Sequence, residues 1–231
     1  MRFSTRIAST LLVTSLLYGT AKADQISQTI GFPIVKTSYN TTLVFNEFDP
    51  SLGTLTAIQI QLDGSVRGTV SAENLGAVPA TITTDLSSVL TLARPDHSVL
   101  IAATPIAQNS FQLSTYDNKL DYSGNSGVSV QNVTASQSES TTLTNPADLA
   151  LFSGAGTITL GLSAIGNSTA WGSNNLATSF STFAGASATI TYIFSNLTPV
   201  PEPTSLALFG CGAAIFLSLL FRRGQDQRRM D

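Results

Sequence analysis

The stretch Leu55-Thr-Ala-Ile-Gln-Ile-Gln-Leu62 alternates between apolar and polar residues. Successive side chains of a β-strand point to opposite faces, so this pattern predicts a strand with one buried face. The pair Asp63-Gly64 follows, which is typical of a tight hairpin turn, and the alternation resumes over Ser65-Val-Arg-Gly-Thr-Val70. We therefore expect a β-hairpin whose turn is formed by Asp63 and Gly64.

The rest of the chain between its two ends repeats this kind of segment. Stretches rich in Thr, Val and Ile are separated by clusters of Gly, Asn, Asp or Pro, which is typical of strands joined by turns. These stretches are residues 28–33, 42–48, 81–92, 99–106, 111–116, 128–142, 156–162 and 187–194. Residues 145–152 suggest one short helical turn, with Asn145 as its cap and Pro146 at its first position. The pattern predicts an all-β fold, a single antiparallel β-sandwich like a jelly roll over residues 24–197.

The first 23 residues are typical of a secretory signal peptide. Arg2 and Arg6 precede an apolar stretch over residues 7–18, which is short for a membrane span. This stretch leads to Ala21-Lys22-Ala23, the small-x-small pattern that signal peptidase cuts. We expect export by the Sec machinery and cleavage between Ala23 and Asp24.

A second apolar segment lies near the C-terminus, after a linker of residues 198–203 that three prolines keep extended. Residues 206–221 carry no charge, and Thr204 and Ser205 extend the segment to 204–221. As a helix, residues 206–221 would reach about 24 Å, slightly less than the roughly 30 Å hydrocarbon core of a bilayer. A basic tail, residues 222–231, follows with Arg222, Arg223, Arg228 and Arg229. Because arginines favour the cytoplasmic side, we expect one transmembrane helix with its tail in the cytoplasm.

Between these ends, residues 24–203 are acidic. Four basic and twelve acidic residues give this part a net charge of −8, whereas the whole chain carries −3. A surface of this sign repels phosphate groups, so no nucleic-acid partner is expected. The one cysteine, Cys211, lies in the apolar C-terminal segment. The body therefore has no thiol for a disulfide bond or for a thiolate metal site.

The body also offers few groups for catalysis. Its one histidine, His97, lies in the turn-like segment Arg94-Pro-Asp-His97, and no serine motif of a nucleophile accompanies it. Asp49, Asp63 and Asp85 could form the acid and base pair of a glycoside hydrolase, but only their number suggests this. We expect a protein that is not an enzyme and needs no cofactor.

Two segments are candidate ligand sites. Side-chain oxygens of the kind that Ca²⁺ prefers occur at Asp117, Asn118, Asp121 and Asn125. Their spacing is not that of an EF-hand, and the same residue types also favour turns. The only tryptophan, Trp171, lies among small residues. Its ring could stack on a sugar, or it could close one end of the sandwich.

The residues Val200-Pro201-Glu202-Pro203 stand directly before the apolar segment and the terminal arginines. This order resembles the PEP-CTERM sorting signal of Gram-negative bacteria, and the match covers residues 200–229. The resemblance implies that exosortase, a membrane enzyme, processes the chain near Pro-Glu-Pro, so that the inner membrane holds the chain transiently. It also implies a location at the cell surface or in the extracellular matrix of bacteria that form exopolysaccharide and biofilms.

The body resembles the choice-of-anchor type E domains that precede such tails. Short matches carry this resemblance, namely Phe48-Asp-Pro-Ser-Leu-Gly-Thr-Leu55, residues 58–70 and Glu73-Asn74. The family implies an all-β fold and supplies no catalytic residue.

The sequence thus favours an exported, non-catalytic surface or matrix protein associated with exopolysaccharide. Two alternatives stay open. The first is a carbohydrate-binding module for the cell's own exopolysaccharide, in which Trp171 would contact the sugar. The second is a secreted hydrolase.

Overall fold

A computed structural model describes residues 23–196 and Gly212, and the predicted all-β fold is confirmed there. The elements in chain order are β1 (Asp24–Lys36), β2 (Tyr39–Asn46), the 3₁₀-helix η1 (Pro50–Leu52), β3 (Gly53–Asn74), β4 (Ala80–Ala93), β5 (Val99–Ala103), β6 (Ile106–Leu113), β7 (Gly127–Leu143), the helix α1 (Pro146–Leu151), β8 (Thr157–Gly166), β9 (Thr169–Trp171) and β10 (Leu176–Asn196). Residues 23–196 form one compact unit.

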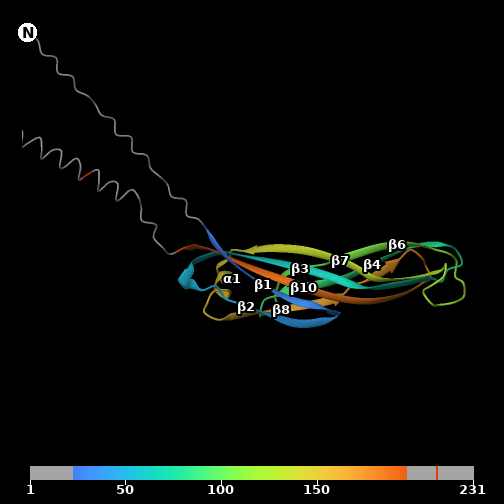
Figure 1. Ribbon diagram of the computed structural model, residues 1–231, viewed down its shortest axis with the longest axis horizontal. Helices are drawn as coiled ribbons and strands as arrows, with labels where there is room; N and C mark the ends of the chain where they lie inside the picture. The colour runs from blue at the N-terminus through green and yellow to red at the C-terminus, as the bar shows by residue number, and fades with distance from the viewer. Residues whose placement is uncertain (1–22, 197–211, 213–231) are drawn as a thin grey trace, which may run out of the picture. The chain divides into compact units, whose positions relative to one another are not determined.

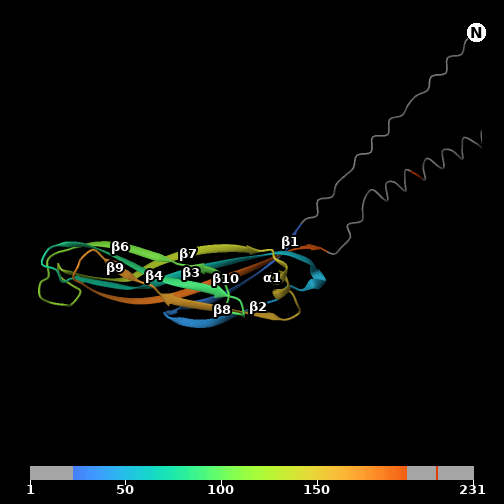
Figure 2. The ribbon, with the colours of Figure 1, turned by 180° about the vertical axis from the view of Figure 1, so that it is seen from behind.

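The strands form two antiparallel sheets. The first sheet has the order β1-β10-β3-β7, and the second has the order β2-β8-β4-β5. The first half of β4 extends past β5 and β8, and there it pairs with β6 on one side and with β9 on the other. Figures 1 and 2 show that the long strands run along the body, with β6 and β9 at the end opposite the start of β1.

The two sheets pack face to face around one main core. Buried and exposed side chains alternate along the strands, so each sheet presents one apolar face to the other. Phe45 of β2 and Leu160 of β8 belong to the same fully buried cluster as Ile60 of β3 and Ile190 of β10. Because this cluster draws on both sheets, the fold is a β-sandwich.

Two smaller clusters continue the core toward β6 and β9. Leu86 of β4 lies in one cluster, against which Phe180 of β10 packs. Ile82 of β4 lies in the other, against which Leu176 of β10 packs. The first half of β4 is therefore level with the first residues of β10.

The predicted hairpin at Asp63 and Gly64 is wrong. Both residues lie inside one continuous strand, β3, where Gly64 is opposite Ala186 of β10 and Gln137 of β7. Leu62, Gly64 and Val66 are all buried, so the alternation passes through the pair without a break. Strands on both sides satisfy the backbone here, and the local turn preference of Asp-Gly gives way to this pairing.

The other predicted strands all overlap observed ones, but several boundaries differ. Residues 187–194 are only the last part of β10, residues 99–106 include β5 and the start of β6, and β9 was not expected. The predicted helical turn is confirmed. Helix α1 begins at Pro146, and the Asn145 side-chain oxygen accepts from the backbone N–H of Asp148 at 2.9 Å.

No helix within residues 23–196 or at Gly212 is long and apolar enough to cross a membrane. The predicted signal peptide up to Lys22, the linker of residues 198–203 and the basic tail of residues 222–231 lie outside the described residues. So does the predicted transmembrane helix of residues 204–221, apart from Gly212.

Candidate functional site

The expected signal-peptidase site lies at the start of β1. Ala21 lies outside the described residues, Ala23 precedes the strand, and Asp24 is its first residue. Asp24 is opposite Phe194 of β10, and the Asn196 side-chain amide donates a hydrogen bond to the Asp24 carboxylate. The start of β1 and the end of β10 therefore lie side by side.

The residues of the expected sorting signal are not among those described by the structure. They are Val200, Pro201, Glu202, Pro203, Arg222, Arg223, Arg228 and Arg229. Their role stays a prediction from the sequence.

The outer face of β9, β4 and β6 carries the single tryptophan. Trp171 is opposite Thr83 of β4, and Thr83 is opposite Ser110 of β6. Residues directly opposite one another in antiparallel strands project from the same face, so these three side chains form a row across three strands. The next residue of β4, Thr84, is fully buried, whereas 47% of Trp171 is exposed. The row therefore faces solvent.

A second row lies beside the first on the same face. Thr169 of β9 is opposite Asp85 of β4, and Asp85 is opposite Gln108 of β6. Gln108 Nε2 donates to Asp85 Oδ1 at 3.0 Å, and within residues 23–196 no other hydrogen bond to this carboxylate is found. We call the two rows together the Trp171 face; its members are Trp171, Thr83, Ser110, Thr169, Asp85 and Gln108.

The turn that follows Trp171 is held tightly. Gly172 has a φ of 122°, and a Cβ atom added there would lie 2.0 Å from the carbonyl oxygen of Thr81, so this position requires glycine. Ser173 Oγ donates to Asn74 Oδ1 at 3.0 Å, and Asn175 Nδ2 donates to the carbonyl of Leu75 at 3.0 Å. These contacts fix the backbone that supports the indole ring.

In the candidate calcium loop, acidic side chains accept hydrogen bonds from the loop's own backbone. Asp117 Oδ1 accepts from the backbone N–H of Lys119 at 2.9 Å, and Asp121 Oδ1 accepts from that of Ser123 at 3.0 Å. Lys119 Nζ lies 2.6 Å from Asp121 Oδ2 and balances the charge of that carboxylate. The hydrogen bonds are those of Asx turns.

Calcium binding at Asp117, Asn118, Asp121 and Asn125 therefore stays a prediction from residue types alone. In the part of the chain that the structure describes, no group of three or more His, Cys, Asp or Glu side chains could hold a metal ion.

A buried carboxylate, Glu73, lies beside this loop. Glu73 is 0% exposed, and its Oε1 accepts from Ser126 Oγ at 2.6 Å. Its Oε2 has no hydrogen-bond partner within residues 23–196. A Cβ atom at Gly127 would lie 2.2 Å from Oε2 and 2.4 Å from the backbone nitrogen of Ser123. Gly127 thus leaves the space that this side chain occupies.

In the segment of His97, Arg94 forms an ion pair with Asp148 of α1, which we call the Arg94–Asp148 clamp. Arg94 donates to Asp148 of α1 through Nε at 2.7 Å and through Nη2 at 3.0 Å. These hydrogen bonds from Arg94 are the main reason that the pKa of Asp148 lies below its usual value. His97 itself has a φ of 68° in the turn that the Arg94–Ser98 backbone hydrogen bond closes. The clamp joins the end of β4 to α1.

The three acids weighed as a hydrolase pair lie on separate elements. Asp49 caps η1 by accepting from the backbone N–H of Ser51 at 2.9 Å. Asp63 belongs to the four-stranded sheet, and Asp85 belongs to the other sheet. The structure therefore does not bring these carboxylates together as a pair.

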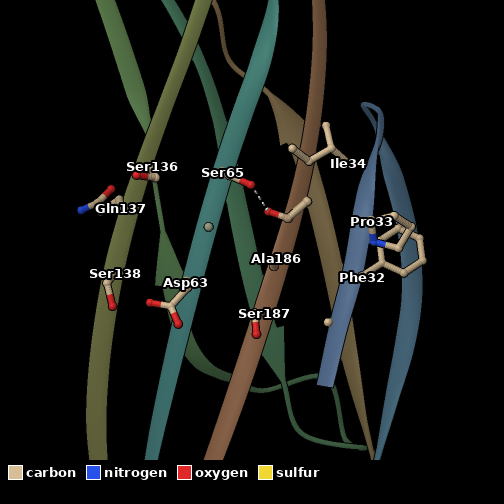
Figure 3. A pocket seen from close by; sticks show the side chains of 13 residues that line it. Phe32, Pro33, Ile34, Asp63, Ser65, Ser136, Gln137, Ser138, Ala186 and Ser187 are labelled. Atoms are coloured by element: carbon tan, nitrogen blue, oxygen red, sulfur yellow. Dashed lines mark hydrogen bonds between the residues drawn. The ribbon is translucent and has the colours of Figure 1, made fainter. Parts of the chain in front are cut away.

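A shallow trough of about 650 Å³ crosses the outer face of the four-stranded sheet (Figure 3). Ser65 and Asp63 of β3 point into it, beside Ser136 and Ser138 of β7. Ser65 Oγ donates to the carbonyl of Gly185 at 3.3 Å. The trough is lined mainly by small residues and is open, so it shows no group arranged for chemistry.

The sequence singled out Trp171 as a possible sugar contact and Asp85 as one of three possible hydrolase acids, but it did not place them on one face. Asp85 and Gln108 lie far from Trp171 along the chain, and only the pairing of β4 with β6 and β9 brings them onto one face. Residues 81–92 were expected to form a strand, without an assignment of its exposed side. No local signal identified its neighbours.

No family model matches the chain, and no curated protein matches it. Among solved structures, the chain is similar to the VP2 subviral particle of infectious bursal disease virus, with a TM-score of 0.21, 7% identity and coverage of 77% of this chain and 37% of the viral chain. For the Gt strain of that virus, the TM-score is 0.13, with 14% identity and coverage of 86% and 48%. The chain spans less than half of either viral chain, and TM-scores this low carry no argument about fold or function.

Proposed function

We propose that the chain is an exported, non-catalytic protein of the cell surface or extracellular matrix, associated with exopolysaccharide or biofilm. The position of the two ends of the body carries this proposal. β1 begins at Asp24, directly after the expected signal-peptidase site, and β10 ends at Asn196, just before the expected linker. Both expected cleavage sites lie outside the strands, so cleavage of the signal and the tail would leave every strand intact. The two ends also lie side by side.

The proposal assigns the tail to sorting and not to permanent anchorage. After export by the Sec machinery and cleavage by signal peptidase, residues 204–221 would hold the chain in the inner membrane. Exosortase would then act near Val200–Pro203 and release the body toward the surface. The order of motif, apolar segment and arginines supports this sequence of events, as does the short length of the apolar segment.

The strand order supports the finer assignment of the fold as a jelly roll. A jelly roll combines two four-stranded sheets built from two Greek keys. The observed orders β1-β10-β3-β7 and β2-β8-β4-β5 correspond to that arrangement when β6 and β9 are taken as continuations of β5 and β8 along β4. We propose that this jelly roll is a stable body that displays exposed side chains outside the cell.

Cell fractionation of a Gram-negative host that contains exosortase tests the proposal. The wild-type chain should appear at the surface or in the medium, whereas a Pro201→Ala/Glu202→Ala variant should stay in the inner membrane. Pro199→Ala, just outside the motif, is the matched control and should behave as the wild type. Retention of all three chains in the inner membrane would contradict the sorting role, and recovery in the cytoplasm would contradict export.

A carbohydrate-binding module for the cell's own exopolysaccharide is the second candidate function. One observation favours it, namely the 47% exposure of Trp171 beside rows of hydroxyl, amide and carboxylate groups. Exposed aromatic rings next to polar groups suit sugars, which have both apolar ring faces and hydroxyls.

A further inference from the structure

We propose that the Trp171 face is a binding platform for a neutral polysaccharide chain, with Trp171 as the stacking surface and Asp85 and Gln108 as the hydrogen-bonding groups. The proposal rests on the second candidate function, and it names the site and the chemical class of the ligand. It does not depend on how the tail is processed.

The side chain of Trp171 is exposed, and its backbone is held by strand pairing. Its ring lies at the edge of the sheet, where β9 has no further strand outside it among the described residues. Trp171 pairs with Thr83 of β4, and the next residue, Gly172, lies so close to Thr81 of the same strand that a Cβ atom added there would be 2.0 Å from the Thr81 carbonyl oxygen. An aromatic side chain has only two rotatable bonds, so on a fixed backbone it loses little conformational entropy when a ligand stacks on it.

The polar groups next to the ring match the hydroxyls of a sugar. Thr83 Oγ1 and Ser110 Oγ lie 3.0 Å apart in the row of Trp171. In the neighbouring row, Gln108 uses Nε2 to orient Asp85, whose Oδ2 then has no hydrogen-bond partner within residues 23–196. A carboxylate oxygen in this position can accept hydrogen bonds from sugar hydroxyls. Adjacent rows on a strand are about 7 Å apart, so these groups lie within reach of a ring stacked on Trp171.

The charges favour a neutral ligand over an anionic one. Lys36, Arg67, Arg94 and Lys119 are the basic residues of the described body, and none of them lies on β9, on β6 or in the first half of β4. Asp85 gives the face a negative charge. Uronic-acid, sulfated or phosphorylated chains would therefore meet repulsion without a compensating cation.

The composition of the face fits a sugar chain better than a protein partner. Protein interfaces concentrate binding energy in a central cluster of apolar and aromatic side chains. On β9, β6 and the first half of β4, the exposed large apolar side chains are Trp171 and, at the opposite edge, Ile106, which is 53% exposed. Hydroxyl, amide and carboxylate groups lie between them.

The location of the face also suits an extracellular polymer. Asp85 lies between Ile82 and Leu86, whose clusters pack against Leu176 and Phe180 at the start of β10. At about 3.3 Å per strand residue, the distance from Phe180 to the end of β10 is roughly 50 Å. The Trp171 face is thus displayed far from the end of the body that leads to the linker (Figures 1 and 2).

Intrinsic fluorescence tests the proposal directly, because Trp171 is the only tryptophan in the chain. The full-length chain in mild detergent is titrated with neutral hexasaccharides of β-linked glucose, galactose and mannose, and with a hexamer of galacturonic acid. We expect quenching and a blue shift with at least one neutral hexamer, and a response to the galacturonate hexamer at least about tenfold weaker.

Calorimetric titration of variants separates binding by this face from binding elsewhere. Trp171→Ala should weaken binding at least about tenfold, Trp171→Tyr should restore part of it, and Asp85→Asn should weaken it several-fold. Phe183→Ala is the matched control, because Phe183 is also a partly exposed aromatic residue but belongs to the four-stranded sheet, which does not carry the Trp171 face. There it lies opposite Arg67. It should bind within about twofold of the wild type. Thermal unfolding of each variant shows whether it is folded.

Three results would overturn the proposal. They are the lack of any fluorescence change with millimolar neutral hexamers, binding that survives Trp171→Ala, and tighter binding of the galacturonate hexamer. None of these results would bear on export or tail processing, which the fractionation experiment measures separately.

Discussion

Two tyrosines carry buried hydroxyl groups, and only one of these groups is hydrogen-bonded. Tyr192 Oη donates to the backbone carbonyl of Asn46 at 2.8 Å. Tyr39 Oη has no partner within residues 23–196. A buried hydroxyl without a partner is destabilising, so Tyr39→Phe should leave the free energy of unfolding unchanged or raise it by up to about 1 kcal/mol. Tyr192→Phe should lower it by about 1 kcal/mol. Urea denaturation checks both, and equal losses would contradict the assignment.

Tyr192 also gives a prediction for the stability of the fold at alkaline pH. Burial, with a smaller effect of the Glu47 charge, raises the pKa of Tyr192 to about 12 from its usual 10.0. The stabilising contribution of the neutral hydroxyl is therefore complete below pH 10 and is lost between about pH 10 and 12, by about 1.4 kcal/mol per pH unit. The advantage of the wild type over Tyr192→Phe should reverse in this range. A difference that stays constant with pH would contradict the burial of the hydroxyl.

The ion pair of Arg94 and Asp148 gives a prediction for acid pH. Hydrogen bonds from Arg94 lower the pKa of Asp148 below its usual 3.8, so the contribution of the pair is present above about pH 4 and is lost as the pH falls further. At pH 7, Asp148→Asn should lower the free energy of unfolding by about 2–3 kcal/mol, because it leaves a partly buried guanidinium without its counter-charge.

Asp121→Asn is the control for this ion pair, because its partner Lys119 is 74% exposed. Its effect should be much smaller, since water screens an exposed pair. The measurement is denaturant unfolding of both variants across acid pH. Similar losses in the two variants would show that Arg94 and Asp148 do not clamp β4 to α1.

At the scale of the element, a bulge in β1 depends on one glycine of β10. Phe32 is opposite Ala186 and Val35 is opposite Ala184, so two residues of β1 face the single Gly185. A Cβ atom on Gly185 would lie 2.8 Å from the backbone nitrogen of Ile34, which is closer than real contacts allow. Gly185→Ala should therefore lower the free energy of unfolding by about 1–3 kcal/mol.

Gly31→Ala is the matched control for the bulge. Gly31 lines the same trough, but its added Cβ atom would lie 3.9 Å from its nearest neighbour. This substitution should change the free energy of unfolding by less than about 0.5 kcal/mol. Thermal and urea unfolding compare the two variants, and a neutral Gly185→Ala would contradict the packing of the bulge against β10.

The sequence predicted an element correctly where its signals lie within a few residues. It failed where pairing with a strand from a distant part of the chain determines the structure. Helix α1 was predicted because its cap and its first proline act within a few residues. The Asp63-Gly64 pair was misassigned because the turn preference is local, whereas β10 and β7 pair across both residues from distant parts of the chain. A Cβ atom on Gly64 would lie 3.1 Å from Leu90 Cδ1, so the glycine allows the sheets to approach closely.

The candidate site shows the same limit. The exposure of Trp171 was one of two possibilities that its small neighbours left open. Its row with Thr83 and Ser110 could not be predicted, because β9 is short and its pairing depends on β4 extending past β8. The expected sorting signal, by contrast, is a local pattern, so it could be predicted from the sequence alone, and it stays a prediction.

At the scale of the whole molecule, the sandwich separates an end that carries the chain's connections from an end that carries the Trp171 face. The pairing of Asp24 with Phe194 places both connections at one end, and β6 and β9 lie at the other (Figures 1 and 2). A body of this form can lose both terminal segments without losing a strand. The proposed binding face would then lie away from the end of the body that precedes the expected linker.

Intact mass spectrometry of the protein recovered from the cell surface or medium tests the central claim most directly. The account predicts a chain that begins at Asp24 and ends near Pro-Glu-Pro, so that its mass excludes the first 23 residues and the four terminal arginines. A surface protein whose mass still includes Arg222 and Arg223 would contradict processing of the tail, and one that retains Met1 to Ala23 would contradict export through a cleaved signal.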